Sequence, residues 1–133
     1  MSALAALLSL MAAAAPAPAP VTLTVRYSDT SGVERVAHLR CRADSARADG
    51  FLRTAGAGTA CRRARSIAVF LATRPSSKRI CTQVYGGRQR ARITGTIGTR
   101  HIDRRLKRTN GCEIGDWQHA VPLVPRVPAG VAP

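Results

Sequence analysis

The chain has 133 residues and a formal net charge of +14, with two phenylalanines, two tyrosines and one tryptophan. This length suits one domain with a modest core and excludes two domains of ordinary size. The charge is carried almost entirely by arginine and indicates attraction to a polyanion or to an acidic protein surface. A GC-rich genome would produce the same excess, because glycine and proline are also frequent, so the charge alone names no partner.

Residues 1–20 have the pattern of a targeting segment rather than of a folded element. An apolar run rich in Leu and Ala covers residues 4–15 and is followed by an Ala-Pro repeat. The run is too short to span a bilayer. Small residues at Ala12 and Ala14 suit a signal peptidase, so we expect a signal peptide and a mature start near Ala15. The alternative is a disordered Ala/Pro leader.

Two strands are expected after this leader. Residues 21–27 alternate between apolar and polar side chains, which predicts a strand with one buried face. A second alternating run covers residues 33–41, and the link at 28–32 contains turn-forming residues. Because the link is short, the two strands should form an antiparallel hairpin.

Residues 42–59 are polar and rich in Gly and Ala, which predicts a long loop anchored by Phe51 and Leu52. A helix should begin near Thr59, as its N-cap, and continue to about Ala72. Its apolar residues fall on one face, with the arginines directed to solvent. The helix would end before residues 74–78, which contain a proline and two serines.

The second half of the chain predicts two more strands. Residues 89–97 and 100–108 both alternate, with basic side chains expected on the outer face. From Pro122 onward the chain is proline-rich, which predicts a mobile, polyproline-like tail. Together these elements predict an α+β fold: an antiparallel sheet of about five strands with one or two helices packed on one face.

Four cysteines, at positions 41, 61, 81 and 112, form an even set in a chain expected to be exported. They include no CxxC motif and no histidine at zinc-ligand spacing, so we expect neither a metal site nor another cofactor. Two disulfides in an oxidising compartment are the better interpretation. Three connectivities are possible. We favour Cys41–Cys61 and Cys81–Cys112, each contributing about 3–4 kcal/mol by the chain-entropy argument.

Several short motifs of this chain occur in the same order as in a known protein family. They are Leu23-Thr24-Val25, Leu39-x-Cys41, Ala60-Cys61, Cys81-Thr82-x-Val84-Tyr85, Gly95 and Asn110-x-Cys112-Glu113. From Val21 to about Val124 the chain resembles the bacterial subtilisin inhibitor family of secreted serine-protease inhibitors. We therefore place the inhibitor-like domain at 21–124 and a flexible Pro-rich tail at 125–133.

The resemblance implies a role for particular residues. Gln83 and Val84 correspond to the P1 and P1′ residues of a reactive bond that is presented to a protease in substrate-like form. The remaining reactive-loop contacts implied are Ile80, Cys81, Thr82, Tyr85 and Asn110. In that family the cysteines pair sequentially, the asparagine supports the loop by hydrogen bonding, and homodimers form through the sheet face opposite the helices. The partner implied is an extracellular serine protease of the subtilisin type.

Two substitutions relative to that family have expected consequences. Gln83 stands where a large apolar or basic P1 residue is usual, which predicts weaker binding in an apolar S1 pocket. Gly86-Gly87 stands in place of Asp-Pro, which predicts a looser exit from the loop.

Two other function classes compete with inhibition. One is a basic exported protein that binds polyanions weakly and non-specifically on the same scaffold, without inhibiting proteases. It would use Arg88, Arg90, Arg92, Arg104, Arg105, Lys107 and Arg108, although no aromatic stripe for stacking bases accompanies them. The other is a nuclease-like enzyme using His38, His101 or His119 with Glu34, Asp103 or Glu113. These histidines form no motif, and we expect no catalytic activity.

Overall fold

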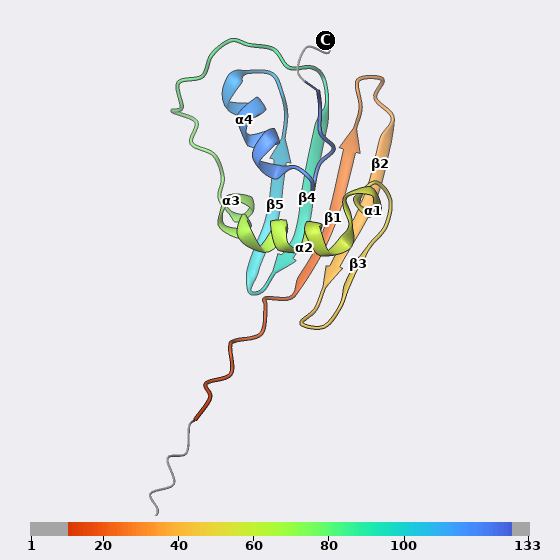
Figure 1. Cartoon of the computed structure of the whole chain (residues 1–133). Helices are drawn as coiled ribbons and strands as arrows, with labels where there is room; N and C mark the ends of the chain where they lie inside the picture. Colours follow the sequence, from red (N-terminus) through yellow and green to blue (C-terminus); the bar gives the residue numbers. More distant parts are fainter. Residues whose placement is uncertain (1–10, 129–133) are drawn as a thin grey trace, which may run out of the picture.

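The computed structural model describes residues 11–128 and contains an α+β domain (Figure 1). Its elements, in chain order, are β1 (Val21–Ser28), β2 (Glu34–Cys41), β3 (Ala46–Ala48), α1 (Leu52–Ala55), α2 (Ala57–Ser66), α3 (Ala68–Ala72), β4 (Arg90–Ile97), β5 (Arg100–Leu106) and α4 (Gly111–Ala120).

The five strands form one sheet in the order β3-β2-β1-β4-β5, and every neighbouring pair is antiparallel. The helices all cover the same face, so the other face of the sheet is left open (Figure 1). At the centre, Leu23 of β1 lies opposite Leu39 of β2 and Gly95 of β4. The hairpin expected from residues 21–41 is therefore confirmed.

The hydrophobic core lies between the sheet and the helices. Alternate residues of each long strand face it, as the sequence predicts for half-buried strands. Val21, Leu23 and Val25 of β1 are at most 1% exposed. Ala37 and Leu39 of β2 and Ile93 of β4 are equally buried. With so few aromatic side chains available, branched aliphatic residues and alanine supply most of the apolar contact area.

The first disulfide joins the sheet to the helical layer. Cys41 at the end of β2 is bonded to Cys61 in α2, and both residues are buried within the core. This is the sequential pairing that we favour from the sequence. The bond fixes α2 against the end of β2, next to the edge strand β3, and limits how far the helix can shift on the sheet.

The region from residue 42 to 72 contains more regular structure than expected. The predicted loop at 42–59 includes the short edge strand β3, the single-turn helix α1 and the start of α2. Leu52 is fully buried and Phe51 partly buried, so the expected anchors are confirmed. The single helix predicted from Thr59 to Ala72 is instead two helices, because Ile67 leaves the helical conformation at φ −111°, ψ 20°.

Helix α4 is the second long helix of the domain. Asn110 caps it, since its side chain accepts a hydrogen bond from the N–H of Glu113 at 3.0 Å. Trp117 of α4 is fully buried, and its ring meets that of Tyr27 edge-on at a centroid distance of 6.0 Å. Helix α4 packs against β5, and its first turn lies against the chain between α3 and β4, since Cys112 is bonded to Cys81 of that segment.

The chain beyond α4 stays in contact with the domain. Leu123 and Val124 are fully buried, and the Trp117 indole N–H donates to the carbonyl of Pro125 at 2.9 Å. Val127 also packs against the core. The packed region therefore extends past the expected boundary at Val124 by a few residues. The rest of the predicted tail, 129–133, lies outside the described residues.

Residues 11–20 are exposed and have no regular structure, and the first half of the expected leader lies outside the described residues. Across residues 11–128, no helix has both the length and the apolar character that a membrane crossing requires.

Candidate functional site

Residues 73–89 connect α3 to β4 without forming a helix or a strand. In Figure 1 this green segment passes outside α4 before it returns to the sheet. It contains an unusual concentration of exposed large apolar side chains. Ile80 is fully exposed, Val84 is 58% exposed and Tyr85 is 45% exposed. Exposed apolar residues held together on one segment are typical of an interaction site.

The segment is braced before Gln83 by a disulfide and a backbone hydrogen bond. Cys81 is bonded to Cys112 in the first turn of α4, with a Cα–Cα distance of 5.3 Å. One residue later, the carbonyl of Thr82 accepts a hydrogen bond from the N–H of Gly111 at 2.9 Å. Gly111 is the first residue of α4, where backbone N–H groups lack partners inside the helix. The loop carbonyl therefore satisfies a helix-terminal donor.

Glycine at position 111 permits this close approach. A Cβ at Gly111 would lie 2.0 Å from the Thr82 hydroxyl oxygen and 3.3 Å from the Thr82 Cβ. Any larger residue would therefore require Thr82 to move or its side chain to rotate.

The segment is braced again after Val84. The N–H of Gly86 donates to the carbonyl of Arg108 at 2.7 Å, and the Arg108 Nε donates back to the carbonyl of Gly86 at 3.1 Å. A Cβ at Gly86 would lie 2.8 Å from the Ile114 side chain and 3.1 Å from the Arg108 carbonyl oxygen. The loose exit expected from Gly86-Gly87 is therefore wrong at Gly86, where the missing side chain permits tight packing.

Only three residues bridge the two braced positions. Gln83, Val84 and Tyr85 are exposed, and within residues 11–128 they make no hydrogen bond. Their backbone groups are therefore available to a binding partner, while Thr82 and Gly86 hold the ends of the bridge. The Gln83–Val84 peptide bond lies inside this bridge.

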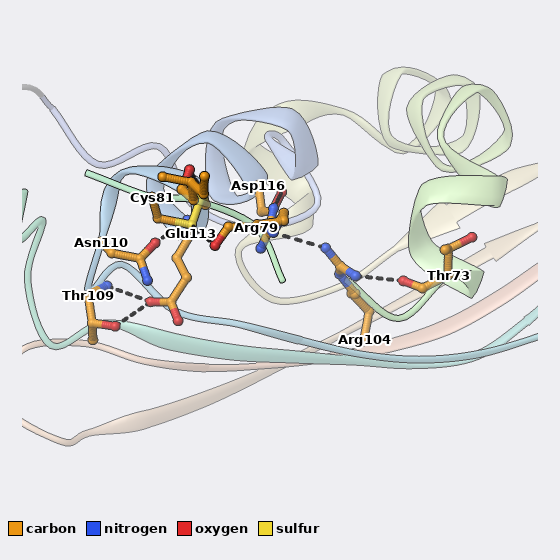
Figure 2. A network of polar contacts seen from close by, with 10 residues as sticks. Thr73, Arg79, Cys81, Arg104, Thr109, Asn110, Glu113 and Asp116 are labelled. Atoms are coloured by element: carbon orange, nitrogen blue, oxygen red, sulfur yellow. Dashed lines mark hydrogen bonds and ion pairs between the residues drawn. A yellow bond between two sulfur atoms is a disulfide. The ribbon is translucent and has the colours of Figure 1, made fainter. Parts of the chain in front are cut away.

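Asn110 acts on the start of α4 rather than by a direct side-chain bond to the loop. Its side-chain oxygen accepts from the Glu113 N–H, as described above. Glu113 in turn accepts from the backbone N–H of Thr109 at 2.8 Å and from the Thr109 hydroxyl (Figure 2). This reciprocal arrangement resembles a capping box. It fixes the helix end that carries Gly111 and Cys112, so its effect on the loop is indirect.

A carboxylate holds the entrance of the loop. Asp116 of α4 binds Arg79 through two hydrogen bonds of 3.1 and 2.9 Å, and also contacts Arg104 of β5 at 3.2 Å (Figure 2). Arg104 donates to the carbonyl of Thr73 at 2.6 Å and lies over the Phe70 ring at 4.4 Å. The side chains of Arg79 and Asp116 therefore join the residue just before Ile80 to the same helix that carries Cys112.

The electrostatics of this network follow from burial and pairing. The hydrogen bond to Asp116 raises the pKa of Arg79, whereas burial lowers the pKa of Arg104 and of Arg108. Arginine stays protonated in proteins, so all three remain cationic. The Arg104 side chain is only 5% exposed, and Asp116 supplies its compensating charge.

Sequence reasoning missed this network because it directed the basic residues of 100–108 to solvent. Arg104 and Arg108 are 4% and 5% exposed and share the inward parity of Ile102 and Leu106. This shared parity was the signal in the sequence that could have identified both arginines as buried. Of the other basic residues considered for polyanion binding, Arg90, Arg92, Arg105 and Lys107 are exposed. The Arg88 guanidinium donates to the carbonyl of Thr30 at 2.9 Å.

The histidines do not form a shared site. His38 on β2 pairs with Asp49 at 3.0 Å, while His101 lies on β5. His119 lies at the end of α4 with its ring against Phe70 at 4.7 Å. Among residues 11–128, no group of three or more His, Cys, Asp or Glu side chains is arranged to hold a metal ion.

No protein-family model matches the chain, and no curated protein matches it significantly.

Proposed function

We propose that the protein is a secreted inhibitor of serine endopeptidases, with subtilisin-like enzymes as its targets and Gln83–Val84 as its reactive bond. The observation that carries the proposal is the exposed bridge of Gln83, Val84 and Tyr85 between two braced positions. A protease binds substrates as extended strands, and a loop held in place in advance loses little entropy on binding. The resemblance to the bacterial subtilisin inhibitor family supports the same assignment, with Gln83 as P1 and Val84 as P1′.

In the proposed complex, residues 80–85 lie in the enzyme cleft and pair with its backbone. The Gln83 side chain enters the S1 pocket, and the enzyme's serine oxygen attacks the Gln83 carbonyl carbon. Collapse of the tetrahedral intermediate breaks the bond to Val84, whose nitrogen takes up a proton and becomes a free amine. Such interfaces bury about 1,600 Å² in total, and their affinity depends on preorganisation more than on area.

Retention of the leaving amine distinguishes an inhibitor from a substrate. Cleavage after Gln83 divides the chain into residues 1–83 and 84–133. The Cys81–Cys112 disulfide joins these two fragments, whereas Cys41–Cys61 lies wholly inside the first. The Thr82–Gly111 and Gly86–Arg108 hydrogen bonds then keep both new ends close together. An amine held near the acyl group re-forms the peptide bond faster than it departs.

Gln83 sets the expected specificity. Its neutral amide leaves polar atoms partly unsatisfied in an apolar S1 pocket, which costs about 1–3 kcal/mol relative to Met or Leu. In a trypsin-like pocket it lacks the positive charge that the enzyme's carboxylate requires. Subtilisin-like enzymes with a tolerant S1 pocket are therefore the favoured targets.

Secretion and self-association belong to the same proposal. The apolar leader and the two disulfides favour export to an oxidising compartment. A homodimer through the open sheet face, which the family resemblance implies, would bring arginine-rich surfaces together. Like charges repel, so such a dimer should be weak at low ionic strength.

Titration of enzymes of known active-site concentration tests the proposal. Oxidised protein is added to a subtilisin-like and a trypsin-like protease, and residual activity is measured against inhibitor concentration. We expect stoichiometric inhibition of the subtilisin-like enzyme and much weaker inhibition of the trypsin-like one. Failure to inhibit either enzyme at micromolar protein would contradict it.

A further inference from the structure

The open face of the sheet carries a group of five cations, which we call the basic patch: Arg26, Arg90, Arg92, Arg105 and Lys107. The strand register places them in two adjacent rows. Arg26 of β1 lies opposite Arg92 of β4, which lies opposite Arg105 of β5. Two residues farther along the strands, Arg90 of β4 lies opposite Ser28 of β1, and Lys107 follows Leu106, the last paired residue of β5. Opposed residues of antiparallel strands point to the same face, and all five cations are exposed.

The patch is only partly neutralised by its neighbours. Arg26 contacts Glu34 at 3.0 Å, and Arg92 binds Asp103 through two hydrogen bonds of 2.9 Å. Within the part of the chain that the structure describes, Arg90, Arg105 and Lys107 contact no carboxylate. Three cations therefore remain available on a patch that faces solvent, away from the helices.

The shape and spacing of the patch suit an extended ligand. All five cations line one shallow hollow of about 370 Å³, together with Ser28 and Glu34. Neighbouring strands are about 5 Å apart, and successive side chains on one face repeat about every 7 Å along a strand. Charges at these intervals match a chain of anionic groups better than one small ion, which needs converging donors.

The aromatic residues are placed elsewhere. Tyr27 packs edge-on against Phe51 and Trp117 on the helix side of the sheet, and Phe70 lies beneath Arg104. None of these lines the hollow. Proteins that bind single-stranded nucleic acids combine a basic groove with aromatic rings that stack on bases. The patch therefore offers cations but no aromatic ring on which a base could stack.

We propose that the basic patch binds a phosphodiester polymer that carries no bases, a polyol phosphate chain of the kind found at cell surfaces. Guanidinium groups bind phosphate through paired N–H donors, so Arg90 and Arg105 would each hold one phosphate and Lys107 would add a third contact. Because the contacts are mainly charge pairs, affinity should fall steeply with salt. The patch is on the sheet face opposite the helices, so binding there is independent of the proposed reactive loop.

Fluorescence anisotropy of labelled poly(glycerol phosphate) with the full-length protein over a range of salt concentrations tests the proposal. The triple variant Arg90→Gln, Arg105→Gln, Lys107→Gln removes the three free cations. Its control, Arg53→Gln, Arg62→Gln, Arg126→Gln, removes the same charge from exposed positions outside the patch. We expect the patch variant to bind at least about tenfold more weakly, and its salt slope to fall by about 2. The control should change affinity by less than about threefold.

Three results would overturn the proposal. One is an equal loss of affinity in both triple variants, which would mean that overall charge is responsible. Another is tighter binding of single-stranded DNA than of poly(glycerol phosphate) at equal ionic strength. The third is a stable dimer of the wild-type protein at low ionic strength, observed by sedimentation, that poly(glycerol phosphate) does not dissociate, since the second copy would then cover the patch.

Discussion

The carbonyl oxygen of Thr82 accepts a hydrogen bond at 2.9 Å from the N–H of Gly111. The residue before Gln83 is thereby joined to the first turn of α4, one position from the Cys81–Cys112 disulfide. A helix end that lacks internal partners for its N–H groups thus acts as the support of the loop.

Replacing Gly111 with alanine should displace the loop without unfolding the helix. The new Cβ would lie 2.0 Å from the Thr82 hydroxyl oxygen and 3.3 Å from the Thr82 Cβ, so the Thr82 side chain must rotate and its Cβ must shift by a few tenths of an ångström. We expect weaker inhibition and faster cleavage after Gln83.

Gly115→Ala is the matched control, because it lies in the same helix and its Cβ would meet nothing within 4 Å. That control should keep inhibition and gain up to about 1 kcal/mol of stability. Equal inhibition by both variants would contradict the role of the Thr82 contact.

Gln83→Met should tighten binding to a subtilisin-like enzyme by about tenfold to a hundredfold, because an apolar side chain leaves no unsatisfied polar atoms in S1. Inhibition constants of the two proteins measure the change. Val69→Met is a useful comparison, since Val69 is an exposed apolar residue on α3, away from the loop. If the Gln83 variant binds no more tightly than the wild type, Gln83 is not the residue that enters S1.

The two disulfides should have different effects on inhibition. Replacing Cys81 and Cys112 with serine removes the link between the two cleavage fragments, so inhibition should become transient as the fragments separate. Replacing Cys41 and Cys61 should leave inhibition lasting, because both residues lie in one fragment. Each pair of substitutions should cost about 3–4 kcal/mol of unfolding free energy. Protease activity followed over several hours, at a temperature where both variants stay folded, separates the two cases.

Arg79→Gln should loosen the entrance of the loop while leaving the fold intact. Its ion pair with Asp116 is partly exposed, so the unfolding free energy should change by no more than about 1 kcal/mol. The rate of cleavage after Gln83 should nevertheless rise, because Ile80 and Cys81 lose one of their attachments. Arg74→Gln removes a neighbouring exposed arginine that has no ion pair within the described residues. Chromatography that separates intact from cleaved protein, sampled during incubation with the protease, should show faster cleavage of the Arg79 variant than of the Arg74 variant.

Asp116→Asn should reduce stability, since it leaves the buried guanidinium of Arg104 without a counter-charge. Removing one partner of a buried ion pair typically costs about 3 kcal/mol or more. Urea denaturation measures the loss. Asp103→Asn provides the control, because the Asp103–Arg92 pair is exposed and should contribute far less. Comparable losses in the two variants would show that the Asp116 network does not stabilise the domain.

Much of the fold could be predicted from local pattern, because the pattern has a direct physical cause. Alternation in residues 21–41 and 89–108 follows from burial of one sheet face, and it predicted all four long strands. The break in the helix at Ile67 and the short elements β3 and α1 were not predicted, because three- and four-residue elements are too short for hydrophobic periodicity to be read. No helix was expected over residues 111–120, because Gly111 and Gly115 lower the intrinsic helix propensity of this segment.

The candidate site was predictable in part. The cysteine spacing and the Cys81–Tyr85 motif indicated the loop. The supports of the loop were not predictable, because they join residues distant in sequence, such as Gly86 with Arg108 and Arg79 with Asp116. A buried arginine is rare enough that Arg104 and Arg108 were assigned to the surface. Only the inward parity of their strand indicated otherwise.

The most direct measurement concerns the bond after Gln83. Oxidised protein is incubated with an equimolar amount of a subtilisin-like protease, and its mass is determined before and after reduction. The account predicts one slow cleavage, between Gln83 and Val84, giving two fragments that stay joined until the Cys81–Cys112 disulfide is reduced. Cleavage at another bond, or rapid degradation of the whole chain, would contradict it.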